Sequence, residues 1–312
     1  STVASTSTDT STDTSTDTST DTSMVKSADS STHPYTDAAG RAPSGQRIKS
    51  RWGFDGNPES RPYKLMMYKP IYIMPAFYTA QHNALPTSPN PKTQVTTADA
   101  PQRIEAKYQI SFKTKLWEGI VGDHGYVWAG YTQSSHWQVF NSAQSRPFRE
   151  TKYEPELGVA FTTPYQVLGW DVDLLSVGFN HQSNGRDLPR SRSWNRIVGQ
   201  VGLERGDWLV MLRPWWRIPE AEADDDNADI TRYVGNGSIQ VRYETDSHAL
   251  STTVNHTFNP KQSRGAVQME YFFPIKNTLR GYVQVNHGYG ASLIDYNHST
   301  TSVGVGVTLV GW

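Results

Sequence analysis

Apolar and aromatic side chains recur at every second position along most of this chain, from residue 70 onward. Successive side chains of a β-strand point to opposite faces, so a period of two indicates strands with one apolar and one polar face. No segment repeats its apolar residues at the spacing of a long amphipathic helix. We therefore predict an all-β fold. Twelve segments are predicted as strands: 70–79, 104–117, 125–140, 154–162, 169–183, 193–205, 207–218, 231–245, 248–258, 265–274, 278–290 and 300–312.

The predicted connections alternate in length. Those of one set are long or medium: 80–103, 141–153, 184–192, 219–230, 259–264 and 291–299. Those of the other set are short: 118–124, 163–168, Gly206, 246–247 and 275–277. Short turns at one end, longer loops at the other and an even number of strands are typical of outer-membrane barrels. A soluble β-sandwich does not require this alternation, so we expect a twelve-stranded antiparallel transmembrane β-barrel.

Composition agrees with a barrel, although it does not require one. The mean hydropathy is −0.61, and no apolar run approaches the roughly 18 residues of a transmembrane helix. Barrel strands escape that test because lipid-facing and lumen-facing residues alternate. The 10 Trp, 16 Tyr and 10 Phe residues suit aromatic girdles, and the last segment closes on Trp312. On composition alone, the alternative is a soluble β-rich protein.

Two further counts exclude classes of partner and site. The formal net charge of −1 gives no bulk field toward nucleic acid, so no nucleic-acid partner is expected. The chain has no cysteine, which excludes a disulfide framework and a thiolate metal site.

The chain before residue 70 has a different composition. Residues 7–22 are four copies of Ser-Thr-Asp-Thr, which offer nothing to bury, so we expect 1–33 to be a disordered tail. Residues 34–69 are rich in Ser, Gly, Pro and charge, which predicts an irregular arm, partly docked through Trp52 and Phe54. The barrel domain is then 70–312.

Candidate catalytic residues lie at the end of one predicted strand and the start of the next. His181 and Ser183 are two residues apart, so they share a face with the apolar Val177 and Phe179. The opposite face of that strand carries polar residues: Ser176, Asn180 and Gln182. On the next strand, Asn195 shares its face with an apolar row. The outer loop 184–192 joins the two strands, so all three polar groups can meet on the lipid-facing side.

Polar side chains that face lipid are costly and point to function. Ser183 would attack an ester carbonyl, His181 would take its proton, and Asn195 would fix the imidazole tautomer. A neutral amide suits the third role, because an aspartate there would place a charge beside hydrocarbon. The alternative is an inert His-Ser pair that occurs by chance.

This stretch, 181–196, resembles the signature of the outer-membrane phospholipase A family. The matching sequences are His181-Gln-Ser-Asn-Gly-Arg186, Ser191-Arg-Ser-Trp-Asn-Arg196, Ser145-Arg-Pro-Phe-Arg-Glu150, Tyr153-Glu-Pro155, Trp208-Leu-Val, Pro214-Trp215, Asp229-Ile-Thr, His287-Gly-Tyr-Gly290 and Ser292-Leu-Ile-Asp-Tyr-Asn297. They occur in the same order from about residue 104 to the C-terminus. The resemblance implies a twelve-stranded barrel of the Gram-negative outer membrane that hydrolyses phospholipid acyl esters. It also implies that His181 is the base, Ser183 the nucleophile and Asn195 the orienting residue, with oxyanion donors near Ser183 and Gly185.

The resemblance further implies a calcium cofactor and an active homodimer. The bridging calcium site would take the Ser145 side chain from one subunit and the Arg186 and Ser191 carbonyls from the other, which are hard oxygen ligands. A further ligand of the family corresponds most nearly to Asp226. The sequence departs from the family at Asp187, because the family's loop acid lies at the position of Leu188. For the acidic loop 219–230, the alternative is a solvated outer loop.

Gln133 is a polar residue on a predicted lipid-facing row with Val127, Ala129 and Tyr131. It matches a polar residue of the family's dimer interface. The alternative is an interfacial residue near the membrane edge.

Two other classes of function compete with the phospholipase. One is a passive pore or display scaffold, which would have no use for His181 and Ser183 on the lipid-facing row. The other is an adhesin, which the Ser/Thr/Asp-rich tail suggests.

Overall fold

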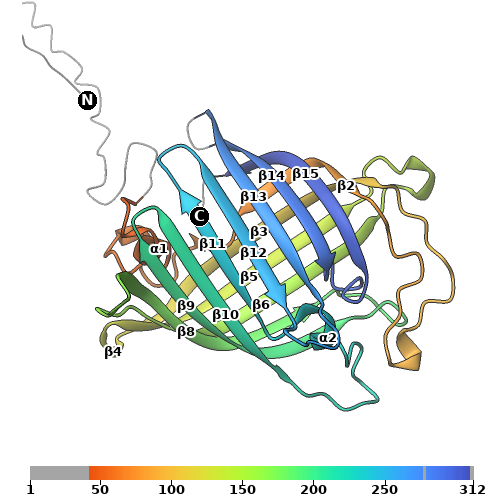
Figure 1. The fold of residues 1–312 in the computed structure, drawn as a ribbon, viewed down its shortest axis with the longest axis horizontal. Coiled ribbons are helices and arrows are strands. Elements are labelled where there is room, and N and C mark those ends of the chain that lie inside the picture. Colours follow the sequence, from red (N-terminus) through yellow and green to blue (C-terminus); the bar gives the residue numbers. More distant parts are fainter. Residues whose placement is uncertain (1–41, 277–278, 310–312) are drawn as a thin grey trace, which may run out of the picture.

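The computed structural model describes residues 42–276 and 279–309. Its long strands form one closed antiparallel barrel, in which β15 pairs with β2, and β3 pairs with both β2 and β5 (Figure 1). The twelve long strands are β2 Ile71–Thr79, β3 Ile104–Glu118, β5 Gly125–Trp137, β6 Phe148–Phe161, β8 Trp170–Ser183, β9 Ser193–Arg205, β10 Trp208–Ile218, β11 Gly237–Glu244, β12 Ala249–His256, β13 Gly265–Lys276, β14 Leu279–Tyr289 and β15 Ser299–Leu309. The predicted twelve-stranded barrel is confirmed. The predicted tail 1–33 and the terminal Trp312 lie outside the described residues.

The chain also forms short helices and strands before and between the long strands. They are α1 Arg47–Arg51, η1 Pro58–Ser60, β1 Met66–Met67, η2 Pro91–Thr93, β4 Ile120–Asp123, η3 Ser142–Gln144, β7 Gln166–Val167 and α2 Thr231–Val234. None of the helices in the described ranges is long and apolar enough to cross a membrane.

Two predicted strand boundaries were wrong. The strand predicted from residue 154 begins at Phe148, because its first residues are mostly charged or polar and hide the apolar alternation. The segment predicted as 231–245 contains helix α2, and its strand starts at Gly237. Gly235 follows the last residue of helix α2 and caps it. Its φ of 75° suits glycine, and an added Cβ would lie 2.4 Å from the His256 carbonyl oxygen.

The long connections gather at one end of the barrel, as predicted. Figure 1 places α2 and the segment 80–103 at that end, and α1 and β4 at the other. At the short-turn end, Gly206 has a φ of 58°, a conformation that glycine adopts without strain and that permits the tight β9–β10 turn.

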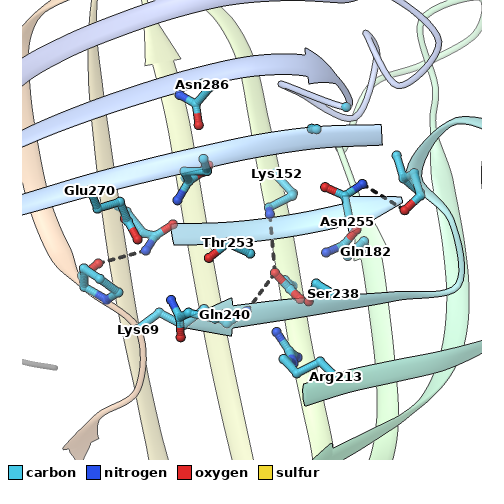
Figure 2. A pocket seen from close by; sticks show the side chains of 18 of the residues that line it. Lys69, Lys152, Gln182, Arg213, Ser238, Gln240, Thr253, Asn255, Glu270 and Asn286 are labelled. Atoms are coloured by element: carbon cyan, nitrogen blue, oxygen red, sulfur yellow. Dashed lines mark hydrogen bonds and ion pairs between the residues drawn. The ribbon is translucent and has the colours of Figure 1, made fainter. Parts of the chain in front are cut away.

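The two faces of the wall follow the predicted alternation. On β8, Val177 and Phe179 point outward and are 48% and 43% exposed. The next residue of the strand, Asn180, points to the inside of the barrel and is buried. Ion pairs join several charged side chains of the interior: Arg213 lies 2.8 Å from Glu156, and Lys69 lies 3.0 Å from Glu154. Lys69, Glu154 and Arg213 line a cavity inside the barrel. Figure 2 shows Lys69, Lys152, Arg213 and Glu270 around it. The apolar surface therefore faces outward, where a bilayer can cover it.

The N-terminal arm packs into the short-turn end of the barrel. Trp52 is buried against Tyr68 and Trp128, and Phe54 packs against the same cluster, so the predicted docking is confirmed. Lys113 lies over the Trp52 ring at 3.4 Å, within the range of cation–π attraction. The carboxylate of Glu204 accepts hydrogen bonds from three backbone N–H groups at the start of α1: Gly45, Arg47 and Ile48.

Candidate active site

The outer ends of β8 and β9 hold the predicted catalytic residues. In the ladder between these strands, His181 pairs with Asn195 and Ser183 pairs with Ser193. Directly paired residues of an antiparallel ladder project to the same face with their Cβ atoms about 5 Å apart. His181, Ser183 and Asn195 therefore lie together on the outward face, in line with the exposed Val177 and Phe179.

A hydrogen bond joins His181 to Asn195. The Nδ1 atom of His181 lies 2.8 Å from the Oδ1 atom of Asn195. An amide oxygen only accepts hydrogen bonds, so this contact places the imidazole proton on Nδ1 and leaves Nε2 as an acceptor. The arrangement can therefore take a proton at Nε2.

Ser183 makes a different contact. Its Oγ accepts a hydrogen bond of 3.0 Å from the Gly185 N–H, which leaves the hydroxyl proton free to be donated. Within residues 42–276 and 279–309, no hydrogen bond joins Ser183 to His181, although both side chains lie on one row. Contacts between a nucleophile and its base are often longer without substrate.

Gly185 keeps a conformation that only glycine fits well. Its φ is 61°, and an added Cβ would lie 2.8 Å from the ring of Tyr153. Tyr153 is in turn the ladder partner of Ser183 on β6. The backbone N–H beside the serine hydroxyl is therefore held by the loop conformation and by the adjacent ring.

The structure adds a residue that sequence reasoning missed. The Nδ2 atom of Asn195 donates a hydrogen bond of 3.1 Å to the Oε1 atom of Glu220. Partial burial and then the nearby charge of Asp225 raise the pKa of the Glu220 carboxyl above its ordinary value. In the sequence, Glu220 comes two residues after the predicted strand 207–218. Its contact with Asn195 depends on the β9–β10 ladder, in which Ile218 pairs with Asn195.

The predicted calcium ligands are only partly brought together. The Ser191 hydroxyl donates a 2.5 Å hydrogen bond to Asp226. The Arg186 side chain donates to the Phe148 and Arg149 carbonyls, both at 2.7 Å, and so ties loop 184–192 to the start of β6. The exposed Ser145 ends η3 in a left-handed conformation, and its backbone N–H donates to the Ser142 carbonyl. Among the described residues, no hydrogen bond joins Ser145 to Arg186 or to Ser191.

The predicted ligands offer the kinds of oxygen atom that calcium prefers. Hydroxyl, backbone carbonyl and carboxylate oxygens are hard ligands. The predicted ligands Ser145, Arg186, Ser191 and Asp226 would contribute only atoms of these kinds. In the part of the chain that the structure describes, no group of three or more His, Cys, Asp or Glu side chains forms a metal cluster. The buried carboxylate of Asp225 forms an ion pair of 2.6 Å with Arg217. Of these two neighbouring carboxylates, Asp226 is therefore the one more accessible to a metal ion.

Gln133 lies on the outward face two strands from the serine. It pairs with Tyr153 across β5 and β6, and Tyr153 pairs with Ser183 across β6 and β8. Its Oε1 accepts a hydrogen bond of 3.0 Å from the Tyr131 hydroxyl. Its Nε2 donates to the Ser135 hydroxyl at 3.4 Å. A polar amide therefore lies on the apolar surface close to the candidate site.

Comparisons with known proteins identify one family. The family model described as Phospholipase A1 matches residues 48–309. Phospholipase A1 of Klebsiella pneumoniae and that of Escherichia coli K12 are each 42% identical over 212 residues, covering 68% of this chain and 72% of theirs.

Solved structures give the same result. Outer membrane phospholipase A from Escherichia coli aligns with a TM-score of 0.70 and 36% identity, covering 79% of this chain and 94% of its own. The Salmonella typhi outer membrane phospholipase dimer with bound calcium aligns with a TM-score of 0.72 and 38% identity, covering 80% and 94%.

Proposed function

The chain belongs to the phospholipase A1 family, and from that premise we propose how it works: as a calcium-dependent homodimer that uses Ser183, His181 and Asn195. Membership makes it a phospholipase, a carboxylic ester hydrolase of the Gram-negative outer membrane. The proposal concerns the residues, the metal and the assembly.

The hydrogen bond between His181 and Asn195 carries the proposal. With Nδ1 donating to the amide oxygen at 2.8 Å, Nε2 faces away and can accept the serine proton. Ser183 Oγ attacks the carbonyl carbon of an acyl ester as its proton passes to His181. The tetrahedral intermediate then expels the lysolipid alcohol, which takes that proton, and water hydrolyses the acyl-enzyme by the same two steps.

The developing oxyanion needs donors that are already in place. Gly185 N–H, which lies beside Ser183 Oγ, and the backbone N–H near Ser183 are the proposed donors. Because the φ of Gly185 and the ring of Tyr153 hold this segment, the donors need little reorganisation as the charge forms.

The position of the site on the wall explains how substrate reaches it. The row that carries His181 and Ser183 continues into Val177 and Phe179, so a lipid acyl chain can lie along the apolar wall while its ester reaches the outer rim. The neutral amide of Asn195 limits the charge placed beside hydrocarbon. A phospholipid in the same leaflet is therefore the substrate that this surface suits best.

Calcium would be held by the Ser145 side chain, the Arg186 and Ser191 carbonyls and, in addition, Asp226. When bound, it supplies positive charge that stabilises negative charge on the substrate. Gln133 would lie in the homodimer interface, where a polar side chain on an apolar face can hydrogen-bond to its copy in the second subunit.

Hydrolysis by the purified full chain tests the proposal. Release of fatty acid from a diacyl phosphatidylcholine in detergent micelles should require calcium and should be lost on Ser183→Ala. A passive barrel would release none, and an enzyme with another nucleophile would keep its rate in the variant.

A further inference from the structure

Asn195 is bonded at both ends of its side-chain amide. Its Oδ1 faces His181 Nδ1 at 2.8 Å, and its Nδ2 faces Glu220 Oε1 at 3.1 Å. An amide can rotate by 180°, which exchanges its oxygen and its NH2 group. The two orientations have nearly the same shape, so only the hydrogen-bond partners distinguish them.

A carboxylate accepts hydrogen bonds and does not donate them. In the rotated orientation, the Asn195 oxygen would face the Glu220 carboxylate, and two acceptors would meet. The Asn195 NH2 would face the protonated Nδ1 of His181, and two donors would meet. The contact with the Glu220 carboxylate would be lost whichever nitrogen of His181 carried the proton, so Glu220 selects the amide orientation that places this proton on Nδ1.

We propose that Glu220 is a positioning residue of the hydrolase: it orients the Asn195 amide and thereby holds the proton of His181 on Nδ1. This inference rests on the proposed function, since it needs His181 to act as the base. Glu220 acts through Asn195 and need not touch substrate.

The neutral amide of Asn195 and the charged carboxylate of Glu220 lie in different surroundings. Asn195 lies on the outward face of the wall, where a charged side chain is expensive. Glu220 lies beyond the end of β10, in the loop, where its carboxylate is partly solvated. Its negative charge favours the imidazolium that forms when His181 takes the serine proton, without placing that charge beside hydrocarbon.

Neighbouring contacts fix the start of this loop. Ile218 is the ladder partner of Asn195. Arg217 donates to the Asp225 carboxylate at 2.6 Å and to the Ala228 carbonyl at 3.1 Å. The segment that leads to Glu220 is therefore tied to the strand on one side and to the acidic loop on the other.

A double-mutant cycle in the full chain tests the proposal, with calcium present and phosphatidylcholine micelles as substrate. Glu220→Ala should lower kcat about tenfold with little change in KM, the size expected for one hydrogen bond to a charged group. Glu220→Gln keeps an acceptor oxygen and should recover part of that loss. Glu222→Ala, two residues further along the same loop and exposed, is the matched control and should keep the wild-type rate.

The decisive measurement is Glu220→Ala in an Asn195→Ala background. If Glu220 acts through Asn195, removing it there should change kcat less than twofold, because coupled residues are not additive. An equal loss in both backgrounds, or a rise in KM alone, would mean that Glu220 supports the loop or the substrate instead. That result would overturn the proposal.

A second readout separates this inference from the proposed function. The rate at which a sulfonyl fluoride labels Ser183 reports activation of the serine without turnover. A wild type that neither hydrolyses lipid nor is labelled would overturn the function and the inference together. An active wild type whose labelling rate is unchanged by Glu220→Ala would overturn the inference alone.

Discussion

His181 on β8 and Asn195 on β9 are direct partners in one ladder, and their Nδ1 and Oδ1 atoms lie 2.8 Å apart. The contact is therefore set by strand register. A slip of one residue would move either side chain to the opposite face of the sheet and break it. The proposed base and its proposed orienting residue both lie on strands of the barrel wall, whereas Gly185 and Glu220 come from the adjoining loops.

Ser183→Ala should remove hydrolysis, with a loss of at least about 10³-fold in kcat, because no other group replaces the nucleophile. The barrel should stay folded, since the side chain is partly exposed and, among the described residues, hydrogen-bonds to Gly185 N–H alone. Fatty-acid release and the heat-dependent electrophoretic shift of folded barrels measure the two effects. Ser193→Ala, at the paired position on β9, is the control. Retained activity in Ser183→Ala would contradict the assignment.

Asn195→Ala should be milder than His181→Ala. In the proposed mechanism Asn195 orients the imidazole and transfers no proton, so the proposed base, nucleophile and oxyanion donors remain in Asn195→Ala. We expect a loss of about 10- to 100-fold in kcat for Asn195→Ala and about 10³-fold or more for His181→Ala. Steady-state kinetics of the two variants under saturating calcium check this order. Equal losses would show that Asn195 does more than orient the ring.

The sequence could predict the local part of this site and of the fold. A period of two places His181 and Ser183 on one face without any knowledge of the neighbouring strands. The same regularity predicted the twelve strands, except where Phe148 begins a charged stretch and where Thr231 begins a helical turn.

The parts that sequence reasoning missed depend on contacts between distant residues. Glu220 reaches Asn195 only because β9 and β10 pair in one register. Helix α1 is held by Glu204, 156 positions away from Ile48, and no local pattern encodes that pairing. Ser145 and Asp226 likewise lie in loops. Loop residues show no regular alternation of apolar and polar side chains, so their positions could not be predicted from such a pattern.

Gly185→Ala should lower activity without unfolding the barrel. The φ of 61° disfavours alanine, and the new Cβ would lie 2.8 Å from the Tyr153 ring, so the backbone must shift. The Gly185 N–H would then move away from Ser183 Oγ, and loss of one oxyanion donor costs about 10²-fold or more in kcat. Pairing this change with Tyr153→Ala should relieve the clash and leave only the φ strain. An unchanged kcat in Gly185→Ala would remove Gly185 from the oxyanion site.

Glu204→Ala should loosen the N-terminal arm and leave catalysis intact. Three backbone N–H groups of the arm would lose their acceptor, at a cost of about 1–3 kcal/mol. We expect a lower unfolding temperature in detergent and faster tryptic cleavage at Lys49 and Arg51. Glu118→Ala, which removes a partly exposed ion pair with Lys115, should change neither, because such pairs contribute little. If Glu204→Ala resisted trypsin as well as the wild type does, Glu204 would not anchor the arm.

Calcium should promote both hydrolysis and dimer formation, and chelation should reverse both. The proposed ligands lie on two separate loops: Arg186 and Ser191 on loop 184–192, and the exposed Ser145 at the end of η3. In the proposed dimer, one subunit supplies the Ser145 side chain and the other supplies the two carbonyls. A metal that binds the dimer better than the monomer must shift the equilibrium by that difference in affinity. Cross-linking and fatty-acid release across a calcium titration measure the linkage.

Ser145→Ala should raise the calcium concentration that gives half-maximal activity and weaken calcium-promoted dimers, while Ser183 is still labelled by a sulfonyl fluoride. Ser145 has a left-handed backbone, which alanine tolerates poorly, so Ser145→Gly removes the same hydroxyl without that strain. Equal effects of both substitutions would assign the change to the lost ligand and not to the backbone. Ser142→Ala, in the same loop, is the control and should titrate like the wild type. If Ser145→Gly leaves the calcium dependence and the dimer unchanged, Ser145 is an ordinary loop residue and the bridging site must be built from other oxygens.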